Sequence, residues 1–153
     1  MGNVNYTLFQ SVTGNAMLVR WASLSTTNNA ADSGQPFPSS TDFALGGAFF
    51  SDKSVQVYAF AAASSSNVII QGSNMVDQVA TPNYIWATLT DPQGNALAFD
   101  MAGGTNPSRI EGVLENPYYI RPLVTSISNV AAATQTMTVD LLLTSVRPAR
   151  SGY

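Results

Sequence analysis

Alternation of apolar and polar residues dominates the chain, and it predicts β-strands rather than helices. The longest alternating run covers residues 135–146, where one face is expected to hold Met137, Val139, Leu141 and Leu143 and the other Thr136, Thr138, Asp140, Leu142 and Thr144. A second run, 54–62, places Val55, Val57 and Ala59 on one face. Turn residues recur about every ten positions, a spacing typical of all-β proteins.

Further strands are expected at residues 17–24, 67–74, 83–90, 96–99, 109–114 and 117–127, which gives about eight to ten strands in all. Asp91–Pro92–Gln93–Gly94–Asn95 is the strongest turn signal, because proline presets φ, aspartate bonds back to amides and glycine supplies positive φ. Pro122 cannot donate to a ladder, so it is expected at an edge or a bulge. The pattern predicts an antiparallel β-sandwich, jelly-roll-like.

The first third of the chain is looser in pattern than the rest. Residues 26–41 are rich in Asn, Ser, Gly and Pro, and they are interpreted as a long loop or an extended arm. Phe37, between Pro36 and Pro38, suits a hook that docks onto a neighbour, or a flexible surface loop. We expect one domain, with residues 1–50 as an N-terminal arm or added strands and residues 51–153 as the sandwich core.

The composition leaves little chemistry. The 153 residues include no Cys and no His, Lys53 is the single lysine, and charged residues make up 10% against 45% hydrophobic. Most enzymes use His, Cys, Lys or clustered carboxylates. We therefore expect that the protein has no enzymatic activity and binds no cofactor or metal. A hydrolase that uses Asp100, Glu111 and Glu115 is a weak alternative. A catalytic pair of Lys53 with Ser51 or Ser54 is a further alternative, but hydrogen bonding of these serines to the nearby backbone explains their positions more simply.

The charge of the chain bears on its partners. A net charge of −3 argues against nucleic acid, which requires a basic surface. Residues 1–9 lack the pattern of a signal peptide, and no apolar stretch is long enough for a membrane span, so no membrane partner is expected. A weakly charged surface favours a large interface and stable assembly.

The aromatic residues have two interpretations. Trp21, Trp86, Tyr84, Tyr118 and Tyr119 could form a platform on which sugars stack, and Tyr84 and Trp86 are expected on one face of a strand. Aromatic residues on strands more often belong to a core or an interface, which is the favoured interpretation.

Residues 53–143 resemble tailed-bacteriophage capsid decoration, or cement, proteins. The resemblance lies in the order of KSVQVYAF, VIIQGSN, YIWATLTDPQGNALAF, IEGVLENPYYIRPLVTS and TMTVDLLLTSV. It implies a non-enzymatic virion protein, made in the host cytoplasm, that binds and stabilises the shell of major capsid protein from outside. Self-association is also expected, with a homodimer favoured because two-fold closure is the commonest symmetry, and a homotrimer possible. A tail or fibre component and a carbohydrate-binding module are the alternatives.

Contact residues are expected among apolar side chains in segments outside the core. These are Phe9, Trp21 and Phe37 in the N-terminal region and Tyr118, Tyr119 and Leu142 on outward edges.

Overall fold

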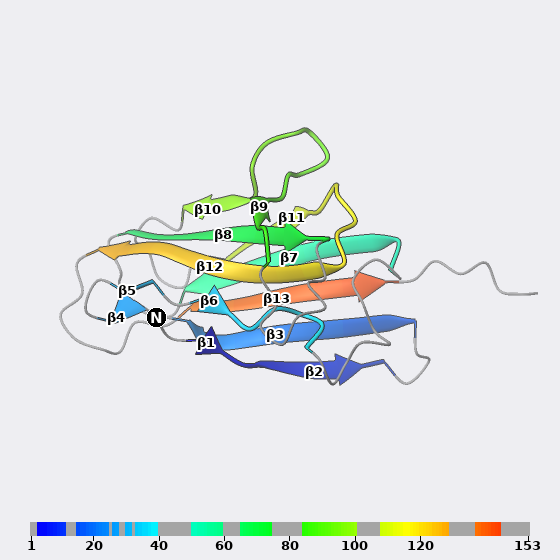
Figure 1. Ribbon diagram of the computed structural model, residues 1–153, viewed down its shortest axis with the longest axis horizontal. Coiled ribbons are helices and arrows are strands. Elements are labelled where there is room, and N and C mark those ends of the chain that lie inside the picture. Colours follow the sequence, from blue (N-terminus) through cyan, green and yellow to red (C-terminus); the bar gives the residue numbers. More distant parts are fainter. Residues whose placement is uncertain are drawn as a thin grey trace, which may run out of the picture.

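The computed structural model describes residues 3–11, 15–24, 26–27, 30–31, 33–39, 50–59, 65–74, 84–100, 108–128 and 137–144. They form two β-sheets whose inner side chains share one apolar core. The long strands of both sheets run side by side along the longest axis of the molecule (Figure 1). The predicted all-β antiparallel sandwich is confirmed. The tail from residue 147 onward lies outside the described residues.

One sheet has five strands, all antiparallel to their neighbours. Its order is β11 (Ser108–Gly112), β7 (Asp52–Ala59), β13 (Met137–Thr144), β3 (Ala16–Leu24) and β2 (Tyr6–Gln10). β13 lies at the centre and pairs with β7 and β3 along its length.

The other sheet has six strands. Its path is β1 (Asn3–Val4), β6 (Ser33–Gly34), β12 (Tyr119–Ser128), β8 (Ser65–Ser73) and β10 (Ala98–Asp100), and β9 (Ala87–Thr88) also pairs with β8. β1 and β6 run parallel. β4 (Thr26–Thr27) and β5 (Ala30–Ala31) form a separate two-stranded sheet.

The core confirms the alternation predicted for β13 and β7. The inward set Met137, Val139, Leu141 and Leu143 is buried, as are Val55 and Val57. Thr138 and Asp140 lie on the opposite face, yet only 7% and 5% of their surfaces are exposed, respectively. Neighbouring side chains on that face therefore cover much of it. Thr136 lies outside the described residues.

The N-terminal region contributes strands to both sheets. β3 pairs with β13 from Ala16 to Leu24, so it is an interior strand of the five-stranded sheet. Trp21 points inward with Met17 and Val19, is 1% exposed, and its Nε1–H donates to the Gln35 carbonyl at 2.9 Å. The expectation that Trp21 is an exposed contact of the N-terminal region is wrong, because the alternation of β3 places it in the core.

Phe37 is also a core residue rather than a hook. It is 0% exposed, and its backbone N–H and C=O exchange hydrogen bonds with Ile120, both at 2.8 Å. Its ring meets Tyr6 edge-to-face at 5.5 Å. The described part of residues 26–41 holds three short strands, whereas the pattern predicted a long loop or an extended arm.

Pro122 lies in an interior strand, so its predicted edge position is wrong, and the register shift of β12 falls between Val124 and Ser126 instead. Ile120 directs its backbone groups toward Phe37, away from β8. By the two-residue period, the nitrogen of Pro122 also faces away from β8. There it meets Gly34 of β6, where a Cβ would lie 2.6 Å from the Pro122 ring. A glycine opposite a proline lets two strands approach where one ladder hydrogen bond is missing.

The predicted turn at residues 91–95 is confirmed. The Asp91 carboxylate accepts hydrogen bonds from the backbone N–H groups of Gln93 (2.9 Å) and Asn95 (2.8 Å) and from Asn95 Nδ2 (2.9 Å). Gly94 adopts a φ of 86°. The hydrogen bonds, that of the Asn95 side chain foremost, lower the pKa of Asp91. The chain then returns through a bridge between Thr90 and Ala96 before β10 begins.

Gly34→Ala should lower the free energy of unfolding by about 1–3 kcal/mol, because the new methyl group would overlap the rings of Pro122 and Trp21. Gly112→Ala is the matched control, since the nearest atoms to its Cβ belong to the Pro92 ring and lie 3.3–3.4 Å away. Urea denaturation measures both variants. Equal losses would contradict the tight contact between β6 and β12.

Asp91→Asn should be less stable than the wild type at neutral pH. The folded state holds the pKa of Asp91 below its ordinary value of 3.8, so the ionised carboxylate stabilises the fold above that value. This contribution is lost as the pH falls through the lowered folded pKa, and the two proteins should converge there. Thermal melts across acidic pH measure the difference. A constant difference would show that the charge of Asp91 is not responsible.

Candidate functional site

The outer side of the five-stranded sheet, here called the β13 face, carries an uncovered apolar row. The register places Phe9 of β2 opposite Leu18 of β3, and Leu18 opposite Leu142 of β13. Phe9 is 47% exposed and Leu142 41%, and Leu18 between them is partly buried. Three neighbouring strands thus present one continuous strip of large apolar side chains.

A charged pair lies beside the apolar row. Arg20 is directly opposite Asp140 and grips it with two hydrogen bonds, Nε to Oδ1 at 2.8 Å and Nη2 to Oδ2 at 2.7 Å. The Tyr58 hydroxyl also donates to Oδ2. The Asp140 hydrogen bond raises the pKa of Arg20. The guanidinium carbon also lies 5.6 Å from the centre of the Phe9 ring. The two charges cancel within the sheet.

The six predicted contact residues do not form one surface. Phe9 and Leu142 are exposed on the β13 face, while Trp21 and Phe37 are in the core. Tyr118 is partly buried near the six-stranded sheet. Tyr119 points outward from β12 but is 2% exposed, so its expected outward contact is wrong. The rings of Tyr84 and Tyr118, at 5.0 and 4.8 Å, cover it.

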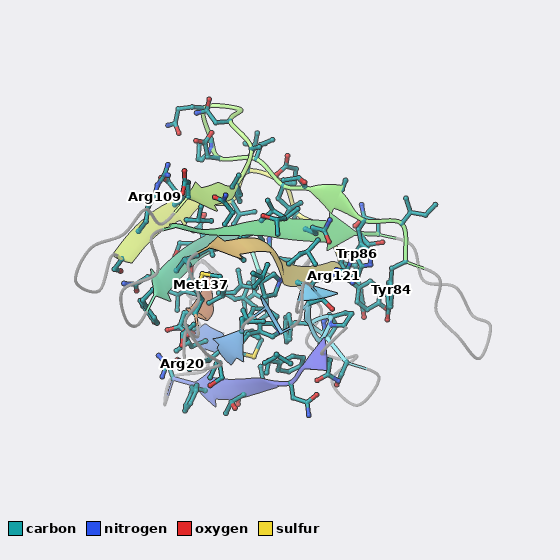
Figure 2. All side chains as sticks on the ribbon, turned by 90° about the vertical axis from the view of Figure 1, so that its left-hand side faces the viewer. Arg20, Tyr84, Trp86, Arg109, Arg121 and Met137 are labelled. Carbon is teal, nitrogen blue, oxygen red and sulfur yellow. The ribbon has the colours of Figure 1, made fainter. Side chains whose placement is uncertain are left out.

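Four of the five predicted platform aromatics come together on the six-stranded sheet. Tyr84 packs on Trp86 at 5.1 Å and on Tyr119 at 5.0 Å, and Tyr118 packs on Tyr119 at 4.8 Å. Burial and the nearby Tyr84 and Tyr118 raise the pKa of Tyr119. We call these four residues with Arg121 the Arg121 cluster. Tyr84, Trp86 and Arg121 gather at one side of the molecule, well away from Arg20 (Figure 2).

Arg121 is the member of this cluster that the sequence analysis did not single out. Its guanidinium carbon lies 4.1 Å from the centre of the Trp86 ring, and its Nε donates to Gln71 Oε1 at 3.0 Å. Burial lowers the pKa of Arg121. The alternation of β12 could have placed Arg121 beside Tyr119, but the contact with Trp86 depends on the fold.

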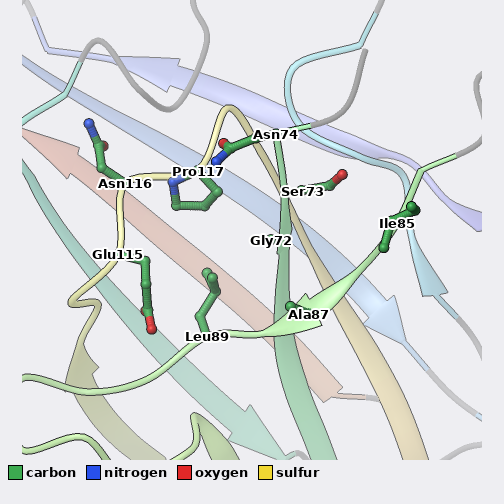
Figure 3. Close-up of a pocket in the computed structure, with 9 residues that line it drawn as sticks. All are labelled: Gly72, Ser73, Asn74, Ile85, Ala87, Leu89, Glu115, Asn116 and Pro117. Atoms are coloured by element: carbon green, nitrogen blue, oxygen red, sulfur yellow. The ribbon is translucent and has the colours of Figure 1, made fainter. Parts of the chain in front are cut away.

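A hollow of about 290 Å³ lies between the end of β8, the segment around β9 and residues 115–117 (Figure 3). It is lined by Gly72, Ser73, Asn74, Ile85, Ala87, Leu89, Glu115, Asn116 and Pro117. Glu115 accepts hydrogen bonds from the Thr90 N–H at 2.8 Å and the Thr90 hydroxyl at 2.6 Å. Burial acts to raise the pKa of Glu115, but these hydrogen bonds outweigh it and the pKa is lowered. An ionised, satisfied acceptor is poorly suited to donate a proton.

The other groups weighed for catalysis have separate local partners. Glu111 pairs with Arg109 at 2.8 Å in the five-stranded sheet, whereas Asp100 lies in β10 of the other sheet. Lys53 Nζ donates to the Phe50 carbonyl at 2.9 Å and to Asn116 Oδ1, and burial lowers its pKa. The described residues contain no group of three or more acidic side chains that could hold a metal. Nor does any helix within them have the length and apolarity to cross a bilayer.

The chain matches no protein-family model and no curated protein. Solved structures with partial similarity include the coat protein dimer of tobacco streak virus, at 10% identity, 93% coverage of this chain, 86% of that chain and a TM-score of 0.33. Another is the K3 adhesin domain of Lys-gingipain from Porphyromonas gingivalis, at 12% identity, 84% and 74% coverage and a TM-score of 0.35. Similarity this low carries no argument about function, and the resemblance to phage decoration proteins stays a prediction.

Asp140→Ala should cost about 1–3 kcal/mol of folding stability, because it leaves both Arg20 and Tyr58 without their shared acceptor. Thr7→Ala, in the same cross-strand row, is the matched control and should cost little. The double variant Arg20→Met with Asp140→Leu should recover most of the loss, since it removes both charges together. Chemical denaturation of the four proteins checks this, and a double variant no more stable than Asp140→Ala would contradict the coupling.

Proposed function

We propose that the protein is a structural virion protein, a decoration protein that clamps the outer surface of a tailed-phage capsid by binding its major capsid protein. The observation that carries the proposal is the β13 face, a rigid sheet with a continuous apolar row and a self-neutralised ion pair. The sequence resemblance supplies the class of partner. The proposed role requires no catalysis, and the separate engagement of Glu111, Glu115 and Lys53 is compatible with that.

The β13 face suits contact with another protein for two reasons. Phe9 and Leu142 are exposed, and burying them against a partner lowers the free energy of the complex. Arg20 and Asp140 already satisfy each other, so covering them leaves no unpaired charge. Each bound copy needs only modest affinity for the capsid, because many copies on one shell act together.

We also propose that copies of this chain associate with one another. A homodimer is favoured, since two-fold closure is the commonest symmetry among soluble oligomers. A homotrimer is the alternative arrangement. Sedimentation velocity of the purified protein separates the two.

Leu142→Asp should reduce occupancy on the capsid by at least about tenfold, because it places an unpaired charge in the apolar row of the proposed contact. Phe9→Asp should act in the same direction. Ala98→Asp is the matched control, since Ala98 is exposed on β10 of the other sheet. Capsids lacking the protein are mixed with each variant, and bound protein is quantified after sedimentation.

Thermal melts of the free variants separate contact from folding. Unchanged melting with reduced occupancy supports the β13 face as the contact. Equal occupancy of Leu142→Asp and the wild type would exclude the β13 face as the capsid contact. A tail or fibre component remains the alternative location, and imaging of labelled particles distinguishes a signal spread over the head from one at the tail.

A further inference from the structure

Three arginines of the described residues lie over aromatic rings, and they differ in one respect. Arg20 stacks on Phe9 and pairs with Asp140, and Arg109 stacks on Phe99 at 5.7 Å and pairs with Glu111. Arg121 stacks on Trp86 more closely than either, at 4.1 Å, but no carboxylate of the described chain lies within ion-pair distance of it.

The guanidinium of Arg121 is partly buried and keeps free hydrogen-bonding capacity. Its one hydrogen bond to the described residues runs from Nε to Gln71, so the two Nη groups donate to none of them. A buried cation without a counter-ion loses hydration without Coulombic compensation. An incoming carboxylate would supply that compensation through two parallel N–H···O bonds on the Nη edge.

Within the described residues, Tyr119 adds to the cluster a polar group without a hydrogen bond. Tyr119 is 2% exposed, and its hydroxyl makes no hydrogen bond to the described residues. The rings of Tyr84 and Tyr118 lie 5.0 and 4.8 Å from the ring of Tyr119 and enclose it. The buried hydroxyl of Tyr119 therefore has a hydrogen bond to offer within an aromatic cluster.

We propose that the Arg121 cluster binds an acidic sugar, with the sugar carboxylate on the Nη edge of Arg121 and its apolar ring face against Trp86 or Tyr84. The Tyr84 hydroxyl and the Gln71 amide would meet the sugar hydroxyls. The site is independent of the β13 face, because it lies on the outer side of the other sheet.

Other ligands fit these groups less well. A neutral sugar would use the rings but leave the Arg121 charge uncompensated. A carboxylate side chain of a protein would pair with Arg121 but leave the Tyr84 hydroxyl and the Gln71 amide without a partner. A nucleoside monophosphate carries up to about two negative charges on its phosphate, and Arg121 alone would leave part of that charge uncompensated.

The test is titration of the full chain with glucuronic acid and with glucose, which differ at one carboxylate. The chain has two tryptophans, and Trp21 is buried, so a change in fluorescence reports on Trp86. Glucuronic acid should bind at least about tenfold more tightly than glucose at low salt, as a charge-assisted bidentate pair implies. Trp86→Phe should abolish the fluorescence change, and calorimetry provides a readout independent of tryptophan.

Arg121→Gln should remove the preference for glucuronic acid over glucose, and Arg121→Lys should retain part of it. Arg109→Gln, which removes a stacked but paired arginine, is the matched control and should leave both affinities unchanged. Thermal melts establish that each variant folds. If Arg121→Gln does not fold, Arg121→Lys provides the test. Binding of glucuronic acid by Arg121→Lys as tightly as by the wild type would contradict the bidentate contact.

Three results overturn the proposal. One is the absence of glucuronic acid binding by calorimetry. Another is an equal affinity for acetate, which would mean that the sugar ring contributes nothing. The third is tighter binding of a nucleoside monophosphate or of an acidic peptide than of glucuronic acid.

Discussion

The structure depends on the two-residue alternation of the central strand β13. Its inward residues, Met137, Val139, Leu141 and Leu143, are buried between the sheets, and the strand pairs with β3 and β7 along its length. A slip of one residue would turn Asp140 and Leu142 into the core and expose the apolar set. The register that builds the core therefore also fixes which side chains appear on the outer surface.

That outer surface combines an apolar row with a charge pair whose partners come from neighbouring strands. Arg20 and Asp140 are 120 positions apart in the chain and meet only because β3 pairs with β13. With Tyr58 donating from the other side, Asp140 is satisfied at 5% exposure. A face of this kind can be covered by another protein without stranding a charge, which an isolated Arg20 or Asp140 would prevent.

The sequence predicted the features that depend on local pattern. The strands around Val57 and Val139 and the turn at Asp91 follow from alternation and turn chemistry, and the structure confirms them. Phe37 was misassigned because its bridge to Ile120 spans 83 positions, and flanking prolines give no sign of it. Residues 83–90 alternate well, yet Ile85 is 66% exposed and Leu89 4%, since only Ala87–Thr88 pairs with β8. The burial of Trp21 could have been predicted, because Met17, Val19 and Trp21 share one face of a strand and Arg20 lies on the other.

The two candidate surfaces differ in how they treat charge, and this separates their roles. On the five-stranded sheet, each stacked arginine has a carboxylate, so Arg20 and Arg109 contribute little net field. On the six-stranded sheet, Arg121 is held by Trp86 and Gln71 and keeps its Nη edge available. A neutral apolar surface favours a broad protein contact, whereas one uncompensated cation among aromatic rings favours a small anionic ligand. The sandwich holds the two on opposite outer faces, so a protein bound to one would leave the other open.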